Sequence, residues 1–448
     1  MDLIEKIFNA GIVGAGGAGF PTHIKLNCNV KYLIVNGAEC EPLLETDKFL
    51  MRTKSTEIIR AMDEVGRMIE AEKLIISLKS KYKNEIKHLE NAIKELNSNV
   101  ELFLLENFYP AGDEQILVYE ITGKSVPEGG IPLDVNLVVS NVGTLVNIFE
   151  AINGNPVIEK YITLIGEINN PGILKVPIGI SIKECIEAAG GSSLNDFSVI
   201  IGGPMMGRIV HKAEIENEFI TKIMGSLILV PSDHYIVKRA QTPIKHIINQ
   251  AKTACIQCSM CTELCPRYLI GHKLRPHRLM RSLGMSENEE EILKEALICC
   301  ECGICELYVC PMGLSPRIVN KYIKEQLRNK KLRYQRDGND ITAKEIREYR
   351  KIPVSRLISR LNLKKYQHKN MEKALEVKAS RVVINLRQHI GVSANPIVAI
   401  GDRVLRGQMI AKVSMEELGA NIHSSIDGVV CKISDSVVIQ RIDNEVIL

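Results

Sequence analysis

The stretches CIQCSMCTELCP at residues 255–266 and CCECGICELYVCP at residues 299–311 decide the organisation of this chain. Their cysteines follow the spacings C-x2-C-x2-C-x3-C-P and C-x2-C-x2-C-x4-C-P. Paired blocks of this kind are the ligand pattern of two 4Fe-4S clusters, because three thiolates on one tight loop can reach three iron corners of a cubane. The fourth cysteine, followed by proline, leaves its loop and commonly ligates the other cluster.

We therefore expect two sets of four ligands. They are Cys255, Cys258, Cys261 and Cys310 for one cluster, and Cys299, Cys302, Cys305 and Cys265 for the other. Structural zinc also uses C-x2-C pairs, but three cysteines at consecutive x2 spacing are awkward for a tetrahedral site. A disulfide framework is the weaker alternative, because 13 cysteines in 448 residues are sparse and the N-terminus does not read as a secretory signal.

Five further cysteines lie outside these two sets. Cys300 is an extra thiol beside the second block, but only Cys299 keeps the x2 spacing to Cys302. The other four are scattered along the chain, so we predict that they are ordinary buried thiols. They are Cys28, Cys40, Cys185 and Cys431.

Length and composition indicate a multidomain globular protein. At about 100–200 residues per domain, 448 residues predict about three domains. A net charge of +4, with no Trp and 4% aromatic residues, argues against nucleic acid as a partner. No apolar run reaches the roughly 20 residues that a transmembrane helix needs. Oxygen-sensitive clusters and free thiols favour a reducing cytoplasm.

Residues 1–150 are predicted to form an α/β domain. Short β-rich runs alternate there with helical stretches whose apolar residues recur at i, i+3 and i+4. The β-rich runs are Tyr32–Asn36, Leu74–Leu78, Leu102–Leu105 and Leu137–Ser140, and the helical stretches are Ser55–Ile69 and Ile86–Leu96. Residues 155–235 read as a small β-rich domain with one helix at Ile182–Ala189.

The cysteines lie at residues 245–330, among helical segments that include an apparent helix at Glu287–Leu297. Residues 331–378 are basic with few large apolar side chains, so a solvated helical connector is favoured over a docking surface for an acidic redox partner. The last segment, 379–448, is β-rich again. Its runs are Val382–Leu386, Pro396–Ile400, Met409–Val413, Val429–Ile433 and Val437–Ile442.

A glycine-rich loop, GAGGAGFPT, occupies residues 14–22, and Lys25 follows it. Such a loop lets the backbone approach a ligand closely and aim N–H groups at a phosphate. It lacks the preceding strand of a dinucleotide fingerprint, so a tightly packed glycine turn is the alternative.

Polar motifs also follow three of the predicted strands, at the edge where open α/β sheets bind ligands. They are NGAECEP at 36–42, YPAGDE at 109–114 and SNVGT at 140–144. Carboxylates are costly in such a pocket unless they have polar partners. The alternative for the four acids of these motifs is a plain surface position.

In this order, the glycine-rich loop, N-x-x-E-x-E-P, Y-x-x-G-D-E and N-V-x-T resemble the FMN- and NADH-binding subunit of respiratory complex I. They also resemble the C subunit of Rnf-type electron-transport complexes. A stronger resemblance, over essentially the whole chain, is to the cobalamin reductase family of propanediol-utilisation microcompartments. In Rnf C subunits a barrel-sandwich domain precedes the glycine-rich loop, whereas here the loop begins at Gly14, which favours the reductase family.

The resemblance implies a multidomain α/β fold. It consists of a flavin-binding α/β domain, a β-grasp domain, a helical two-cluster domain and a C-terminal barrel-sandwich domain. It also implies an FMN and NADH pocket. The residues implied are Gly14, Gly16, Gly17, Gly19, Phe20, Lys25, Asn36, Glu39, Glu41, Tyr109, Gly112, Asp113, Glu114, Asn141 and Thr144. Within it, the glycines would line the FMN phosphate, Lys25 would pair with a phosphate and Phe20 would stack near the nicotinamide.

Three departures from the complex I pattern weaken the prediction of NADH more than that of FMN. Ala15 replaces an arginine, Ala38 an aspartate and Ser140 the first of two asparagines. The C-terminal turn IHSSIDG at 422–428 has no lysine, so we expect no covalent prosthetic group there. The segment GGPMMG at 202–207 is either a corrinoid or partner surface or, as we favour, a tight turn with core methionines.

The expected function is an oxidoreductase that passes electrons from NADH through FMN and two clusters to a corrinoid or another one-electron acceptor. The cofactors carry this chemistry, so no side chain is assigned a catalytic role. An adenosyltransferase, microcompartment shell proteins and a place inside the microcompartment are implied by the resemblance. One alternative is a membrane-associated electron-input subunit of an Rnf-like complex. The other is a non-catalytic electron-transfer adaptor in which only the clusters work.

Overall fold

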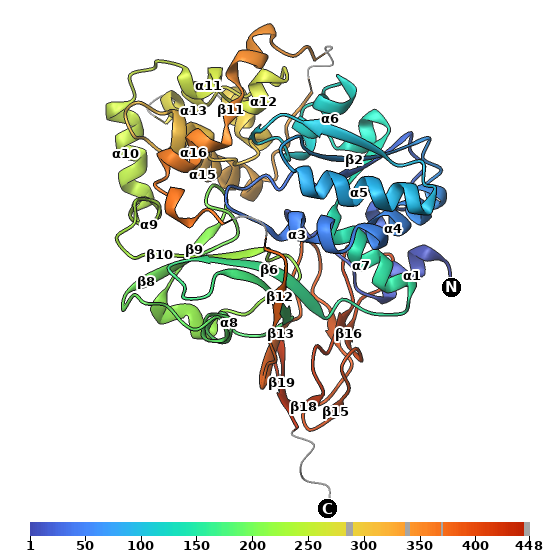
Figure 1. The fold of residues 1–448 in the computed structure, drawn as a ribbon. Coiled ribbons are helices and arrows are strands. Elements are labelled where there is room, and N and C mark those ends of the chain that lie inside the picture. The colour runs from blue at the N-terminus through green and yellow to red at the C-terminus, as the bar shows by residue number, and fades with distance from the viewer. Residues whose placement is uncertain (284–289, 337–340, 369–370, 443–448) are drawn as a thin grey trace, which may run out of the picture.

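A parallel sheet organises the N-terminal part of the computed structural model, which describes residues 1–283, 290–336, 341–368 and 371–442 (Figure 1). Its strand order is β3-β2-β1-β5. The strands are β1 (Tyr32–Asn36), β2 (Lys73–Lys79), β3 (Glu101–Leu105) and β5 (Leu137–Asn141). Leu33–Val35 in the centre of β1 are fully buried, as expected for a parallel strand covered on both faces. All four predicted runs are confirmed.

Helices pack around this sheet. They are α1 (Leu3–Asn9), α2 (Thr22–Lys25), α3 (Thr46–Thr53), α4 (Ser55–Met68), α5 (Lys83–Leu96), α6 (Glu114–Thr122) and α7 (Val142–Ile152). The predicted helices at Ser55–Ile69 and Ile86–Leu96 are confirmed. Asn141 ends β5 and caps α7, and Asp113 caps α6, because each side chain accepts hydrogen bonds from the first-turn N–H groups.

A second, mixed sheet has the order β12-β7-β6-β10-β8-β9. Its strands are β6 (Glu159–Gly166), β7 (Gly172–Pro177), β8 (Phe197–Ile201), β9 (Arg208–His211), β10 (Ser226–Pro231) and β12 (Ala374–Glu376). Helix α8 (Ile182–Ala188) packs beside it and confirms the single predicted helix of this region. A capping box between Ser181 and Glu184 begins that helix.

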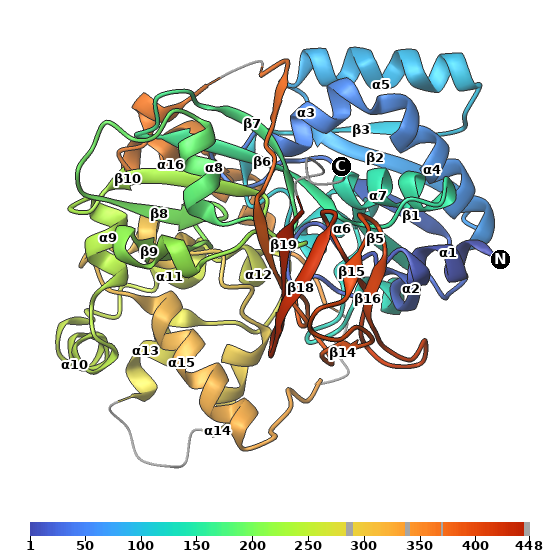
Figure 2. The same cartoon turned by 90° about the horizontal axis from the view of Figure 1, so that it is seen from below.

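The cysteine region consists of short helices and tight turns (Figure 2). The helices are α9 (Tyr235–Ala240), α10 (Ile244–Ala254), α11 (Met260–Glu263), α12 (Pro266–Leu269), α13 (Pro276–Ser282), α14 (Glu290–Lys294) and α15 (Pro316–Asn329). The predicted helix at Glu287–Leu297 begins outside the described residues. Its described part is α14 followed by a 3-10 turn at Glu295–Ile298.

The basic connector at 331–378 corrects our expectation of a solvated helix. Strand β11 (Ile352–Pro353) pairs with β4 (Phe108–Tyr109), and β12 adds to the second sheet beside β7. Between these strands, α16 (Val354–Arg360) buries Leu357, and the turn after it buries Leu361 and Leu363 completely. The apolar residues alternate with Lys and Arg, so one side of the segment packs against the protein while most of the cations on the other side face water. Arg347 is an exception, because it is buried in an ion pair with Glu120.

The C-terminal segment forms two small sheets. One contains β13 (Arg381–Asn385), β15 (Arg403–Val404), β18 (Gly428–Ile433) and β19 (Ser436–Arg441), and the other contains β14 (Asn395–Pro396), β16 (Met409–Lys412) and β17 (Ile422–His423). The predicted run at Pro396–Ile400 is wrong beyond Pro396, because the Asp402 carboxylate accepts from the Ala399 N–H and closes a turn there.

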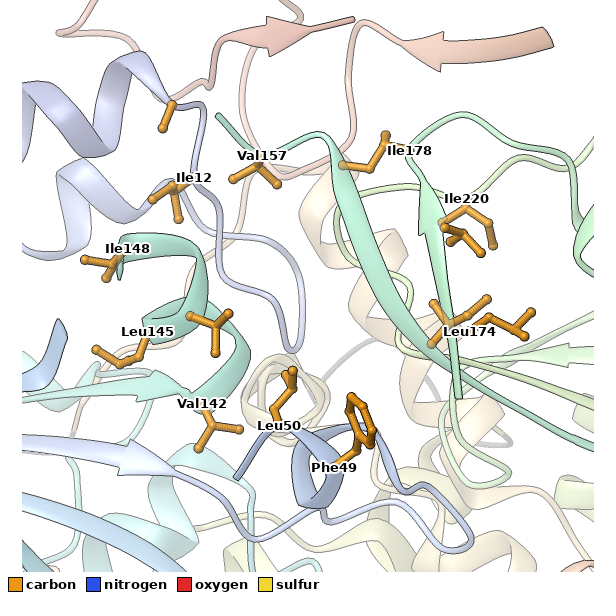
Figure 3. Close-up of a cluster of buried hydrophobic side chains, with 14 of the residues drawn as sticks. Ile12, Phe49, Leu50, Val142, Leu145, Ile148, Val157, Leu174, Ile178 and Ile220 are labelled. Atoms are coloured by element: carbon orange, nitrogen blue, oxygen red, sulfur yellow. The ribbon is translucent and has the colours of Figure 1, made fainter. Parts of the chain in front are cut away.

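One hydrophobic core joins three of these regions. Figure 3 shows Leu50 and Val142 of the first region in one buried cluster with Val157, Leu174 and Ile178. Ile384 and Val430 of the C-terminal sheet belong to the same cluster. Packing of this kind holds the regions in one arrangement. Within the described residues, the structure contains no helix with the length and apolar character of a membrane span.

Candidate functional site

A cavity of about 930 Å³ lies at the edge of the parallel sheet, where the second sheet and the C-terminal segment meet it. Fourteen of the fifteen residues predicted for the FMN and NADH pocket line this cavity. They are Gly14, Gly16, Gly17, Phe20, Lys25, Asn36, Glu39, Glu41, Tyr109, Gly112, Asp113, Glu114, Asn141 and Thr144. Segments separated by more than a hundred residues therefore converge on one site, and the volume falls in the range of cofactor pockets.

Gly19 is the predicted residue that does not line the cavity. Its φ is +71°, and a β-carbon there would lie 2.6 Å from Ile223 and 3.1 Å from His389. Ala18 beside it accepts a hydrogen bond from the Ile390 N–H at 3.2 Å. Gly19 thus allows the glycine-rich loop to pack against the second and C-terminal regions, which is a structural role.

Two hydrogen bonds to Ala15 hold the glycine-rich loop in place, and the loop lines the cavity. The Ala15 N–H donates to Thr144 Oγ1 at 2.9 Å, and Lys160 Nζ donates to the Ala15 carbonyl at 3.3 Å. The N–H groups of Gly16 and Gly17 make no hydrogen bond within the described part of the chain. Since unpaired N–H groups at a glycine loop attract anions, this loop suits a phosphate.

The polar motifs at the strand ends chiefly hold one another in place. Asn36 donates to the Gly112 carbonyl at 2.9 Å, and a β-carbon at Gly112 would lie 2.9 Å from Cys40. Asn141 donates to Asp47 at 2.8 Å while it caps α7. Sequence reasoning assigned these side chains to ligand contacts, whereas the structure shows that several of their polar groups are already used to shape the cavity.

Three further predicted residues form ion pairs. Lys25 lies 2.8 Å from Glu114, and both side chains are partly exposed. Asp113, which caps α6, also lies 2.9 Å from Arg267 of the cysteine region. Arg267 is buried and the Asp113 side chain is only 14% exposed, so this pair fixes the cysteine region against the wall of the cavity.

Buried acids give the cavity its electrostatic character. Burial raises the pKa of Asp47 to about 6, although the Asn141 amide opposes this shift, and burial also raises the pKa of Glu39. The same cause lowers the pKa of Lys160 to about 8, against the attraction of Asp47. Carboxyl groups with raised pKa values can keep a proton near neutrality and act as hydrogen-bond donors.

Glu41 connects three regions of the molecule. Its Oε2 accepts from the Met205 N–H at 2.9 Å, and its Oε1 lies 3.3 Å from the Tyr109 hydroxyl. That hydroxyl donates to the Cys302 carbonyl at 2.8 Å. Burial raises the pKa of Glu41 to about 7. Met205 is buried, as expected for a core methionine, but Met206 is exposed and lines the cavity.

The eight predicted ligand cysteines surround two small cavities. Cys255, Cys258, Cys261 and Cys310 line the outer cysteine cavity, and Cys265, Cys299, Cys302 and Cys305 line the inner cysteine cavity together with Cys300. These are the two sets expected from the sequence. Cys302 also lines the large cavity. Of the four scattered thiols, Cys185 is buried as predicted, whereas the prediction is wrong for Cys431, which is exposed.

Sequence reasoning missed several residues of the large cavity. They are Asp47, Lys160, Lys175 and Arg406. Asp47 follows Thr46 at the start of α3 and belongs to no recognisable motif. The other three lie in or beside strands whose pattern signals only the sheet, so their place in the site depends on how the regions pack.

Comparison with known families agrees with this division of the chain. Residues 7–150 match the Nuo51 FMN-binding domain, 161–209 the SLBB domain, 254–315 a 4Fe-4S dicluster domain and 360–448 the RnfC barrel sandwich hybrid domain. The chain therefore contains an FMN-binding domain and a 4Fe-4S dicluster domain. Its fold is also similar to a chain of an NAD+-reducing NiFe hydrogenase, with a TM-score of 0.50, 18% identity and coverage of 72% of this chain and 62% of that one.

Curated relatives share most of the sequence. The cobalamin reductase PduS of Salmonella typhimurium is 39% identical over 439 residues, which cover 98% of this chain and 96% of the relative. The C subunit of the Na(+)-translocating ferredoxin:NAD(+) oxidoreductase complex of Acetobacterium woodii is 36% identical over 60% of this chain and 58% of its own. The near-complete match in both directions shows that this chain belongs to the family of the cobalamin reductase PduS.

Proposed function

We propose that this chain takes electrons from NADH and passes them through FMN and two 4Fe-4S clusters to a corrinoid. Membership of the cobalamin reductase family, together with the FMN-binding and dicluster domains, supports an oxidoreductase of the flavin and iron–sulfur type. The electron donor, the number of clusters and the acceptor are the parts that we propose.

One observation carries the proposal. Cys302 lines both the large cavity and the inner cysteine cavity, and its carbonyl accepts a hydrogen bond from Tyr109 in the wall of the large cavity. A site of the size of a flavin and a site lined by a cluster of thiols therefore share a wall. This arrangement suits a centre that exchanges two electrons next to one that exchanges single electrons.

The large cavity fits FMN by the chemistry of its lining. The open N–H groups of Gly16 and Gly17, with Lys160 below the loop, would hold the phosphate. Bound FMN supplies the chemistry of accepting a hydride and releasing its electrons one at a time. Glu41 and Asp47, whose pKa values lie near neutrality, would donate hydrogen bonds to polar groups of the ring or nucleotide. Phe20, at the edge of the cavity, would pack against the nicotinamide.

The two cysteine cavities fit 4Fe-4S clusters by their donor sets. Each lining includes three thiols from one tight loop and the proline-linked cysteine of the other block, and the inner one also includes Cys300. That crossing is the ligation expected for this spacing. We propose Cys255, Cys258, Cys261 and Cys310 as the ligands of the outer cluster, and Cys299, Cys302, Cys305 and Cys265 as those of the inner cluster.

The test uses protein purified without oxygen and reconstituted with iron, sulfide and FMN. Flavin and cluster absorbance are followed on addition of NADH, and cob(III)alamin is added afterwards. We expect NADH to bleach both chromophores and cob(III)alamin to restore them while it is reduced. Bleaching without transfer to the corrinoid would move the acceptor to a ferredoxin or membrane partner, as in the Rnf-like alternative. Failure to bind FMN would leave only the electron-transfer adaptor.

On the resemblance alone, we also propose an adenosyltransferase and microcompartment shell proteins as partners. An adenosyltransferase would consume the reduced corrinoid. Co-purification of the reconstituted protein with each candidate, compared with a variant that lacks both cysteine sets, measures these contacts. Binding of neither would restrict the proposal to the free corrinoid.

A further inference from the structure

The two cysteine cavities differ in their access to solvent. Cys265, Cys302 and Cys305 of the inner cysteine cavity are each less than 10% exposed, whereas Cys258 of the outer cysteine cavity is exposed. The inner cavity shares a wall with the large cavity, so the outer cavity lies at the other end of the chain of centres. Electrons that enter at the large cavity would reach the surface at Cys258.

An apolar surface surrounds this point. The exposed apolar collar consists of Ile256, Met260 and Met312, with 61%, 39% and 47% of their surfaces exposed. Ile256 and Met312 line the outer cysteine cavity, and Met260 lies between Cys258 and Cys261 in sequence. Methionine and isoleucine clustered around one site are typical of protein-contact surfaces, because methionine adapts its shape to a partner.

Basic side chains flank the collar. Helices α10 and α13 lie side by side in both views, next to α11 (Figures 1 and 2). Lys252 on α10 lies three residues before Cys255, and Arg278 on α13 follows His277, which lines the outer cavity. Both are exposed, and neither makes an ion pair with another described residue.

The described acids of the neighbouring helices lie close to other cations. Glu290 and Glu291 on α14, which packs against α13, pair with Lys294. Glu263 on α11 accepts from Ser259 Oγ at 3.0 Å and lies 3.6 Å from Arg350. Arg281, one turn after Arg278 on the same helix, adds a further exposed cation. The rim of the collar is therefore positive, and a positive rim attracts an acidic partner.

We propose that the exposed apolar collar is the docking surface of an acidic one-electron carrier protein. The inference rests on the proposed function, because it needs a cluster in the outer cysteine cavity. One electron passes from the reduced outer cluster to the oxidised centre of the carrier, and no bond is made or broken. The collar excludes water from the contact, while Lys252, Arg278 and Arg281 orient the carrier during its approach.

The test measures electron transfer from the reconstituted protein to two carriers of opposite charge. The protein is reduced with dithionite, and excess dithionite is removed, so the result does not depend on NADH. The carriers are soluble cytochrome b5, which is acidic, and cytochrome c, which is basic. We expect cytochrome b5 to be reduced faster at low salt, with a rate that falls as the ionic strength rises.

The double variant Lys252→Glu with Arg278→Glu should reduce cytochrome b5 about tenfold more slowly at low salt. The exposed Lys432→Glu on β18 is the matched control and should change nothing. Each protein is first checked for equal iron content and equal bleaching by dithionite. If the double variant loses iron, the inference is tested only by the salt dependence of the rates at which the unchanged protein reduces the two carriers.

Three results would overturn the inference. They are equal rates for the double variant and the Lys432 control, a faster reaction with cytochrome c than with cytochrome b5, and slower reduction of cob(III)alamin without any change for cytochrome b5. The last result would assign the collar to the corrinoid itself. Failure of NADH to bleach the protein, with transfer from the dithionite-reduced form intact, would count against the proposed function and leave this inference standing.

Discussion

The inner and outer cysteine cavities are built from nearly the same local motif, yet one is enclosed and the other is open. The inner one lies between the flavin-binding region, the second sheet and α16, and Tyr109 donates to Cys302 within it. The outer one lies under α10, α11 and α13, with Cys258 at the surface. The motif determines which thiols gather. In the function that we propose, the surroundings determine which site receives electrons and which delivers them.

The largest expected difference between the inner and outer sites appears when one proposed ligand is removed from each. Cys302→Ser and Cys258→Ser should each lose about half of the iron, since each removes one ligand of one cluster. In Cys258→Ser, NADH should still bleach the inner cluster. In Cys302→Ser, NADH should leave the outer cluster oxidised although dithionite reduces it. Absorbance and electron paramagnetic resonance under both reductants measure this difference.

Cys431→Ser, which changes an exposed thiol on β18, is the control for this pair and should keep all of the iron. Equal bleaching of the remaining cluster by NADH in the two ligand variants would contradict the proposed order of the sites.

The second prediction concerns the packing that encloses the inner cavity. Leu361 is fully buried in the cluster that contains Tyr109 and Cys302. Leu361→Ala should therefore cost about 2–5 kcal/mol of stability and lower the Tm by several degrees. Leu405→Ala, at an exposed leucine, should leave the Tm nearly unchanged. Similar Tm values for both variants would mean that the connector does not support the enclosed site.

The third prediction uses the buried acid of the large cavity. Burial raises the pKa of Asp47 to about 6 from an ordinary 3.8. Between about pH 4 and 6 the native carboxyl still holds a proton that the unfolded chain has released, so the free energy of unfolding falls as the pH rises through this window. The free energy of unfolding of Asp47→Asn should not fall in this way. By pH 6 it should exceed that of the unchanged protein by about 2–3 kcal/mol.

Thermal unfolding at pH values from about 4 to 8 measures this gain. The Tm difference between Asp47→Asn and the unchanged protein should grow up to about pH 6 and then level off. Asp233→Asn, at an exposed acid, should give a curve parallel to that of the unchanged protein. Parallel curves for Asp47→Asn as well would show that the carboxyl is not destabilised by burial.

The smallest expected effect is on FMN affinity. Gly17 has a φ of +73°, and a side chain there would meet no other atom within 4 Å. Gly17→Val should distort the loop at a cost of about 1–2 kcal/mol, which weakens FMN binding about tenfold. Gly123→Val is the matched control, because Gly123 has a φ of +69° and equal space but lies at the end of α6. Quenching of FMN fluorescence measures the FMN affinity of both variants. Equal affinities of Gly17→Val and Gly123→Val would contradict the proposed phosphate site.

Much of the fold could be predicted from local pattern. The strands at Tyr32–Asn36 and Leu137–Ser140 and the helix at Ser55–Ile69 were recognisable because burial on a sheet or helix face imposes a short period on the sequence. The prediction of a solvated helical connector at 331–378 is wrong, because its few leucines lie among many Lys and Arg residues and form no clear apolar pattern. Only their fully buried positions against other regions reveal that they belong to a core.

The two sets of cysteines and the glycine-rich loop are readable from local sequence, because ligand spacing and backbone freedom are properties of a few neighbouring residues. Three other features come from tertiary packing: Cys302 lies in the walls of two cavities, Asp47 and Lys160 line the large cavity, and Cys258 faces solvent. These facts depend on contacts between segments more than a hundred residues apart. Their geometry is set by the packing of whole sheets and helices, and no local motif encodes it.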